Sequence, residues 1–262
     1  MFGSFEESLS SGLFLVVFFV VVLVAVVIGY WVGQRTSPAK EGTGDAALNT
    51  ALAAILGVVA LVLSFSFSFS LSRYDARRLL VVQESNDIGT LYLRTSVLDK
   101  PAADSLRAII RDYTARRITY YLDGNDPAAQ ARDQVASDGL QNQMWTIVSD
   151  AVRANPRSQG PSLLMQVTND VIDTSAEQAA ELHYRLRGPG LFLIFLVAIV
   201  GAFVIGLGFG SARTPNWIVS LIFVMLMAVL VNTIIDLDSP QGGRIHVNLT
   251  PLYDLQHSMG RP

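Results

Sequence analysis

No cysteine occurs anywhere in the 262 residues, and this excludes disulfide frameworks, cysteine-based zinc sites and thiol nucleophiles. Charged residues are also scarce: they make up 16% of the chain, against about 25% in an ordinary soluble domain. The formal net charge is −3, so the chain has no overall basic field with which to bind nucleic acid. The low share of charge points instead to a membrane protein.

Motifs for enzyme chemistry are missing as well. No P-loop, GxGxxG or GxSxG motif occurs, and the three histidines, His183, His246 and His257, have no metal-binding spacing. The segment "GLGFG" at 206–210 is rich in glycine, and we interpret it as a place of helix packing or helix termination. We therefore expect no enzymatic activity, no cofactor and no metal site.

The sequence is rich in long apolar runs. Hydrophobic residues make up 51% of the chain, and the mean hydropathy is +0.40. A helix needs roughly 20 apolar residues to cross a bilayer, and four stretches reach that length: residues 13–32, 48–71, 190–210 and 217–235. Acidic Glu6 and Glu7 stand where a signal peptide has its basic region, and no A-x-A-like site follows. We therefore interpret the first stretch as a retained helix.

The second apolar stretch ends in "SFSFSFSLS" at 64–72, where Phe and Ser alternate as in a half-buried strand. A lone strand in lipid would leave backbone N–H and C=O groups without partners, because only helices and closed barrels satisfy them internally. We therefore predict a helix here. On a helix, two neighbouring lines of side chains form: Ser64, Ser68 and Ser72, and beside them Leu61, Phe65 and Phe69.

These serines have two interpretations. Small residues let membrane helices approach closely, and a serine hydroxyl bonds across to a neighbour or back to its own turn. We favour this packing role for most of them. The second interpretation is a pore wall, in which apolar side chains gate by dewetting while hydroxyls meet the ions.

Positive charges near helix ends indicate which side each loop faces, because they concentrate on the cytoplasmic side. Arg35 and Lys40 follow the first helix and, alone, favour an outside N-terminus. If the N-terminus is inside, Arg35, Lys40 and Arg213 lie outside, but more of the positive charges near helix ends lie on the cytoplasmic side. This orientation places six arginines inside: Arg73, Arg77, Arg78, Arg185, Arg187 and Arg244. We expect both termini and the central domain to be cytoplasmic.

Residues 73–188 hold nearly all of the charge. Apolar residues recur there at helical spacing, and breakers such as "DGNDP" at 123–127 separate the runs. The pattern predicts a helical domain with helices at about 75–98, 102–122, 127–154 and 162–187. The first and last of these are candidates for continuity with membrane helices.

The predicted architecture is an all-α membrane protein in which two pairs of transmembrane helices flank a helical cytoplasmic domain. The segments are an N-terminal stretch, helices 1 and 2, the helical domain, helices 3 and 4, and a tail: 1–12, 13–72, 73–188, 189–236 and 237–262. In the tail, "RIHVNL" alternates as a short strand or an extended arm does. We expect it to pack on the helical domain or on a neighbouring subunit.

Two charged groups lie at predicted membrane ends. The first is Arg73, Asp75, Arg77 and Arg78 in "SRYDARR", and the second is Asp236 and Asp238 after the fourth apolar stretch. We favour pairing of these arginines and acids across helices. The alternative is an ion vestibule, in which arginines attract anions or acids bind a regulatory cation such as calcium.

A further unusual segment is "ESNDIGTLYLR" at 84–94. A glycine in a helix interior costs roughly 1 kcal/mol relative to alanine, so Gly89 predicts close approach by another helix. Asn86 and Asp87, if buried, need hydrogen-bond partners.

The chain from about residue 48 onward resembles the bestrophin-like family, whose members are mostly bacterial. The resemblance lies in "SRYDARRLLVVQESNDIGTLYLR" and "IIDLDSPQGGRIHV", together with the 2+2 order of membrane helices. More distantly it is similar to bestrophins, which are pentameric anion channels with a neck in a context like S-F-x-x-G-F. That resemblance implies a pore neck at Leu61, Phe65 and Phe69. Two features differ: Ser68 replaces the glycine, and the proline beside the neck is absent.

The functional hypothesis is an oligomeric, anion-selective ion channel in the bacterial plasma (inner) membrane. The implied partners are the lipid bilayer, chloride-like inorganic ions and further copies of the chain, with a pentamer as the implied assembly. Ser64, Ser68 and Ser72 would be the polar pore-lining residues. The alternative is a non-conducting membrane scaffold or sensor whose helical domain binds a partner. No partner role for nucleic acid is expected.

Overall fold

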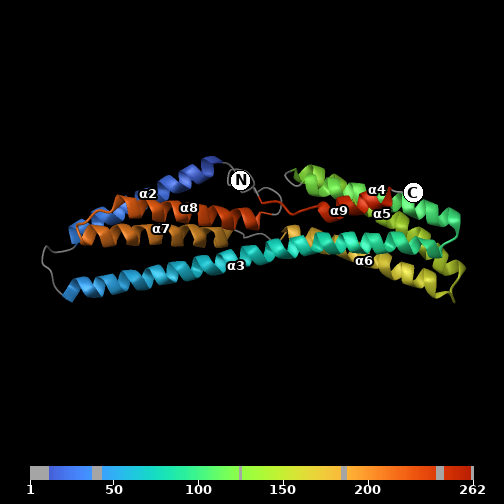
Figure 1. The fold of residues 1–262 in the computed structure, drawn as a ribbon, viewed down its shortest axis with the longest axis horizontal. Helices are drawn as coiled ribbons and strands as arrows, with labels where there is room; N and C mark the ends of the chain where they lie inside the picture. Colours follow the sequence, from blue (N-terminus) through green and yellow to red (C-terminus); the bar gives the residue numbers. More distant parts are fainter. Residues whose placement is uncertain (1–11, 37–42, 124–125, 184–187, 240–244, 261–262) are drawn as a thin grey trace. The chain divides into compact units, whose positions relative to one another are not determined.

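The computed structural model describes residues 12–36, 43–123, 126–183, 188–239 and 245–260, and within them the chain is helical with no β-strand. The helices in chain order are α2 (Gly12–Thr36), α3 (Thr43–Arg94), the 3₁₀ turn η1 (Thr95–Val97), α4 (Lys100–Leu122), α5 (Pro127–Ala154), α6 (Gln159–His183), α7 (Gly188–Ser211), α8 (Trp217–Asp238) and α9 (Thr250–Met259). Figure 1 shows these elements as a ribbon.

Among the described residues, α2, α3, α7 and α8 are long and apolar enough to cross a membrane. They coincide with the apolar stretches found in the sequence, which confirms the all-α class and the 2+2 order of membrane helices. The alternating segment 64–72 is helical throughout, as backbone satisfaction in lipid requires. With 52 residues, α3 is about 78 Å long at 1.5 Å per residue. It therefore continues well past the roughly 30 Å of a bilayer core.

The chain divides into two compact units. The membrane unit comprises residues 1–73 and 185–239, and the helical unit comprises residues 74–184 and 240–262. Helix α3 contributes its apolar half to the first and its charged half to the second. The predicted continuity of the first domain helix with a membrane helix is thus confirmed at α3. The same prediction for the last domain helix involves residues 184–187, outside the described part.

Within the membrane unit, α2 and α7 touch through their backbones. A Cβ added at Gly206 would lie 2.0 Å from the carbonyl oxygen of Val26, and one added at Gly29 would lie 2.1 Å from that of Phe203. The same close approach occurs at Gly210, opposite Tyr30. Small residues spaced by four allow this approach between membrane helices. The packing role predicted for "GLGFG" is confirmed.

The helical unit buries an apolar core between α3, α4, α5, α6 and α9. Its fully buried members come from all of these helices: Ile88, Leu91, Leu106, Ile110, Met144, Val148, Leu164, Val171 and Leu252. The breakers in the sequence fall where the helices begin. Asp126 caps α5 by accepting hydrogen bonds from the N–H groups of Ala128 and Ala129, and Pro127 occupies the first turn.

The tail differs from the expectation. Residues 245–249 form no strand, and the next residues form α9, which the sequence analysis did not predict. The prediction that the tail packs on the helical domain is correct. Leu252 and Met259 are buried there, and the Ser85 hydroxyl donates to the Pro251 carbonyl at 2.9 Å.

Docking of α9 explains Gly89. A Cβ at this position would lie 3.2 Å from Cδ1 of Leu255, so the close approach predicted from the glycine is confirmed. At the end of α9, Arg111 Nε donates to the Met259 carbonyl at 3.1 Å, where a cation also interacts favourably with the helix dipole.

We predict that Leu252→Ala lowers the free energy of unfolding by about 2–5 kcal/mol, because the side chain is fully buried and its removal leaves a cavity. Asp254→Ala on the exposed side of α9 is the control, and its change should stay within about 0.5 kcal/mol. Thermal unfolding of the purified chain in detergent compares the two. Equal melting temperatures for both variants would show that α9 is not docked as described.

Candidate pore helix and its charged end

The predicted neck residues lie on one exposed side of α3. Leu61, Phe65 and Phe69 are 55%, 57% and 63% exposed within the single chain. Ordinary packing inside the subunit therefore does not account for these large apolar side chains. This face of α3 is therefore available to contact lipid, another subunit or a pore.

The opposite side of α3 contacts its own subunit. Leu52, Val59, Leu63 and Ser70 are buried, and Val59 lies against Gly201 of α7, where an added Cβ would be 3.1 Å from its Cγ1. Phe67 packs against the same core. The Phe–Ser alternation thus resolves into a helix that holds Leu63, Phe67 and Ser70 inward while Phe65 and Phe69 point outward.

The serines separate in the same way. Ser64, Ser68 and Ser72 are exposed beside the predicted neck residues. The hydroxyls of Ser64 and Ser66 donate to the carbonyls of Ala60 and Val62 one turn earlier, at 2.7 and 2.9 Å. This back-bonding satisfies the hydroxyl while leaving an oxygen lone pair exposed. The packing interpretation fits Ser66 and Ser70, which face the subunit, better than it fits the exposed line.

At the charged end of the membrane unit, an arginine and an acid pair across helices. Arg73 Nη1 of α3 lies 2.6 Å from Asp238 Oδ1 of α8, and the side chains are 28% and 9% exposed. The favoured prediction for this group is therefore confirmed for these two residues. Asp236 accepts a hydrogen bond from the Asn232 amide at 3.1 Å.

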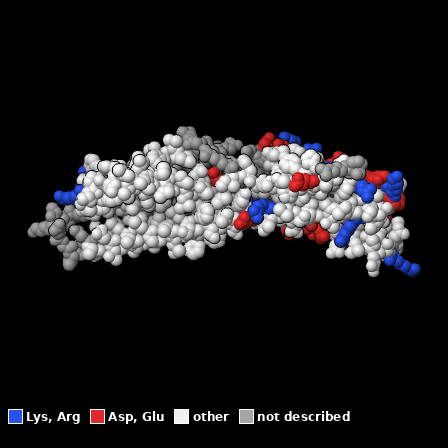
Figure 2. All heavy atoms as spheres, viewed as in Figure 1, with Lys and Arg blue, Asp and Glu red and all other residues white. Residues whose placement is uncertain are grey.

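The remaining predicted charges are not brought into one cluster. Asp75 and Arg78 are exposed, whereas Arg77 is buried. Among the described residues, no three acidic or histidine side chains gather as a metal site would require. On the face drawn in Figure 2, charged side chains lie mainly over the helical unit, and the surface of the membrane unit is almost uncharged.

The helical unit contains a buried ion pair that the sequence analysis did not predict. Arg117 of α4 and Glu84 of α3 are both fully buried and in direct contact. Gln178 accepts a hydrogen bond from the same guanidinium, and the Tyr121 hydroxyl donates to Glu84 at 3.1 Å. The Tyr120 ring lies 4.5 Å from the guanidinium carbon. The sequence position of Arg117 indicated its burial, because Arg117 lies on the apolar stripe of α4, four residues after Tyr113 and three before Tyr120.

The electrostatics of this pair favour the ionised state of the arginine. Burial is the largest single effect on Arg117 and opposes its charge, but Glu84, through its charge and its hydrogen bond, together with Tyr113 and Tyr121 outweighs burial and raises the pKa of the guanidinium. Burial, and then the nearby Glu84 charge, raise the pKa of the Tyr121 hydroxyl. Tyr121 therefore stays protonated and remains a hydrogen-bond donor to the carboxylate.

Two neighbouring residues in "ESNDIG", Asn86 and Asp87, have different surroundings. Asp87 finds the partner it needs, because the Thr174 hydroxyl donates to its Oδ2 at 2.8 Å. Asn86 is exposed. Its side chain is therefore open to solvent, and the need for a partner that was stated for a buried asparagine does not arise.

Fold and geometry together define an all-α membrane protein with four spanning helices and a helical domain built on the extension of the second. The sequence matches the Bestrophin-like domain family over residues 19–252, and the chain belongs to this family. No curated protein gave a significant match.

The fold is shared with solved bacterial structures. A bacterial bestrophin homologue from Klebsiella pneumoniae matches over 94% of both chains with a TM-score of 0.63 at 14% identity. A mutant of that homologue gives a TM-score of 0.64 at 14% identity, covering 94% of this chain and 98% of the other. A structure described as a membrane protein gives a TM-score of 0.65 at 14% identity over 94% of each chain. At these identities the matches show the fold alone.

Proposed function

We propose that the protein is an oligomeric, anion-selective ion channel whose pore is lined by α3 of each subunit. The observation that carries the proposal is the exposed side of α3, where Leu61, Phe65 and Phe69 stand beside a line of serines. In a ring of subunits that side would surround the axis, as the bestrophin pore helix does. A pentamer is the assembly we expect from the family.

The neck and its surroundings have distinct roles in this proposal. Rings of Leu61, Phe65 and Phe69 would close the path by dewetting, and opening them would let ions pass. The hydroxyls of Ser64, Ser68 and Ser72 would meet the ions beside the neck. Between residues 48 and 71 the chain has no charged side chain, so selectivity would come from outside the apolar segment.

Arginines beyond the neck favour anions. Arg78 is exposed, and Arg73 is partly neutralised by Asp238, so Arg78 and its copies would supply most of the attractive potential. The helical unit would form a cytoplasmic vestibule, with both termini on the same side of the plasma membrane. The proposal assigns the chain no catalytic reaction, no cofactor and no nucleic-acid partner.

Chloride efflux from liposomes containing the purified oligomer tests the proposal. We expect the double variant Phe65→Ala/Phe69→Ala to conduct several times faster than the wild type, because smaller side chains widen and wet the neck. Phe192→Ala is the matched control, since Phe192 is a 66% exposed phenylalanine on α7. Its flux should equal the wild-type flux. Equal rates for the double variant and the wild type would remove the neck assignment.

A non-conducting scaffold or sensor is the second candidate. Large apolar side chains are exposed on the helical unit, among them Leu79 at 60%, Leu93 at 74% and Val135 at 71%, and such side chains suit a protein partner. A folded oligomer without flux of chloride or potassium, in wild type and double variant alike, would favour this candidate.

A further inference from the structure

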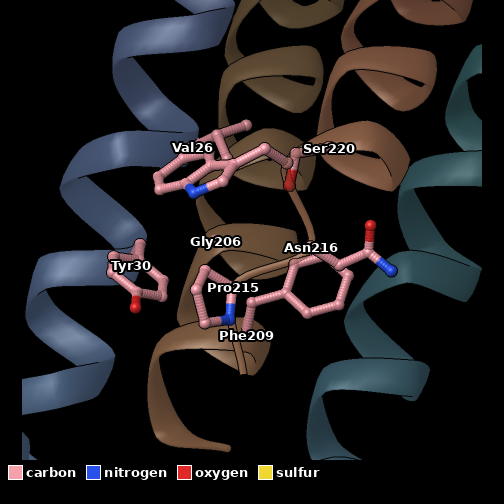
Figure 3. A pocket seen from close by; sticks show the side chains of 8 residues that line it. Val26, Tyr30, Gly206, Phe209, Pro215, Asn216 and Ser220 are labelled. Carbon is pink, nitrogen blue, oxygen red and sulfur yellow. The ribbon is translucent and has the colours of Figure 1, made fainter. Parts of the chain in front are cut away.

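The crevice between α2, α7 and α8 offers an ion no route through the membrane unit. Val26 and Tyr30 of α2 and Phe209 of α7 line it together with the start of α8 (Figure 3). The atoms that line the crevice leave no room for a water molecule. An ion path along an outer face of the subunit is consistent with this packing.

The part of α3 that belongs to the helical unit has an exposed face without charge. From position 79 to position 97, every exposed residue of α3 and η1 is uncharged. The other long helices of the unit carry charge on their exposed faces: Arg111 and Arg116 on α4, Arg132 and Arg153 on α5, and Asp170 and Asp173 on α6. A helix face in bulk water usually carries charged residues, so the exposed face of α3 is expected to have different surroundings.

Five residues of this face form a line along the helix, the α3 line. They follow one another at alternating spacings of four and three residues, the repeat of a heptad: Leu79, Gln83, Asn86, Thr90 and Leu93. Three polar residues thus lie between two exposed leucines. The same spacing leads back along the unbroken helix, through Ala76, Ser72 and Phe69, to Phe65.

The polar residues on the inner side of the same segment hold the bundle together. Glu84 pairs with Arg117 of α4, and the Ser85 hydroxyl donates to a carbonyl of α9. Gln83 and Asn86 are exposed on the other side of α3. Their amides are therefore available to a ligand outside the subunit.

We propose that Gln83, Asn86 and Thr90 of each subunit line the ion path within the helical unit and donate hydrogen bonds to chloride-like anions. This inference rests on the proposed channel and names the groups that its anions contact beyond the neck. Amides and hydroxyls donate hydrogen bonds without carrying a charge. Such donors suit conduction, because an ion must be bound firmly enough to enter and weakly enough to leave.

Thiol labelling of the purified oligomer tests the position of the α3 line without any flux measurement. Asn86→Cys is compared with Asn142→Cys, whose parent residue is exposed on α5, and the chain has no cysteine of its own. A small maleimide should label both variants. The same maleimide on a large polyethylene glycol should label Asn142→Cys alone, because a path inside the oligomer excludes the polymer.

Two labelling results would overturn the inference. Labelling of Asn86→Cys by both reagents would place the α3 line on the outer surface. Labelling by neither reagent would place it in a contact between subunits.

Chloride efflux from liposomes supplies the second arm. Asn86→Asp should slow efflux about three- to tenfold, because a carboxylate from each subunit would repel anions in the path. The loss should shrink at high salt, which screens the added charge, whereas a structural defect would not respond in this way. Asn86→Lys should conduct chloride at least as fast as the wild type. Asn142→Asp is the matched control and should leave efflux unchanged.

The two arms separate failure of this inference from failure of the proposed channel. Equal efflux for Asn86→Asp and Asn142→Asp, with a conducting wild type, would overturn the inference and leave the channel in place. A wild type without flux would remove the channel and the anion contacts together, and the labelling would then show only where Asn86 lies.

Discussion

Replacing Arg117 by methionine is expected to lower the free energy of unfolding by about 3–5 kcal/mol, the range seen when one partner of a buried ion pair is removed. Glu84 would remain fully buried with its charge uncompensated. Arg153→Met is the matched control, because Arg153 also pairs with an acid, Asp150, but at 77% and 63% side-chain exposure. That change should stay within about 1 kcal/mol. Thermal unfolding in detergent measures both.

The double variant Glu84→Leu/Arg117→Met separates the charge from the packing. It removes both buried charges, so it should be no less stable than Arg117→Met alone. Part of the loss would remain, because Gln178 and Tyr121 lose their partners. An Arg117→Met variant as stable as Arg153→Met would contradict the burial of this pair.

Gly206→Ala should also have a large effect. The added methyl group would meet the Val26 carbonyl at 2.0 Å, and two backbones cannot move apart as a flexible side chain can. We expect a loss of about 3 kcal/mol or more of stability, at or above the upper end for overpacking, or no folded product at all.

Gly57→Ala is the control for this substitution. Apart from its own chain neighbours and helix backbone, no atom lies within 4 Å of a Cβ at position 57, so alanine should leave stability unchanged or raise it by up to about 1 kcal/mol through helix propensity. Expression level and melting temperature compare the two variants. A Gly206→Ala protein as stable as Gly57→Ala would show that α2 and α7 do not touch through their backbones.

Run length and hydropathy were sufficient to predict the spanning helices. The requirement for roughly 20 apolar residues and for internal backbone hydrogen bonds leaves few alternatives for stretches such as 217–235. Proline also marked helix starts correctly at Pro127, where it follows a capping aspartate. The short α9 was not predicted, although Leu252, Leu255 and Met259 recur at helical spacing, because the adjacent "RIHVNL" alternates as an extended segment does.

The side of α3 that faces its own subunit could not be derived from the sequence. Lipid, a neighbouring helix and a closed neck are all apolar, so hydrophobicity does not distinguish Leu63, which is buried, from Leu61, which is exposed. The burial of Arg117 was only partly visible in the sequence. Helical spacing places Arg117 on the apolar stripe with Tyr113 and Tyr120, but its partner Glu84 lies on another helix, so the sequence did not show what would compensate the buried charge.

The chain lacks cysteine, so a thiol reagent will react only with a cysteine introduced by substitution. The most direct test of the central claim is block of chloride efflux by a charged thiol reagent applied to Phe65→Cys, Ser68→Cys and the control Phe192→Cys. A pore lined by α3 predicts strong block of the first two variants and none of the third. Equal insensitivity of all three, or block of Phe192→Cys alone, would contradict it.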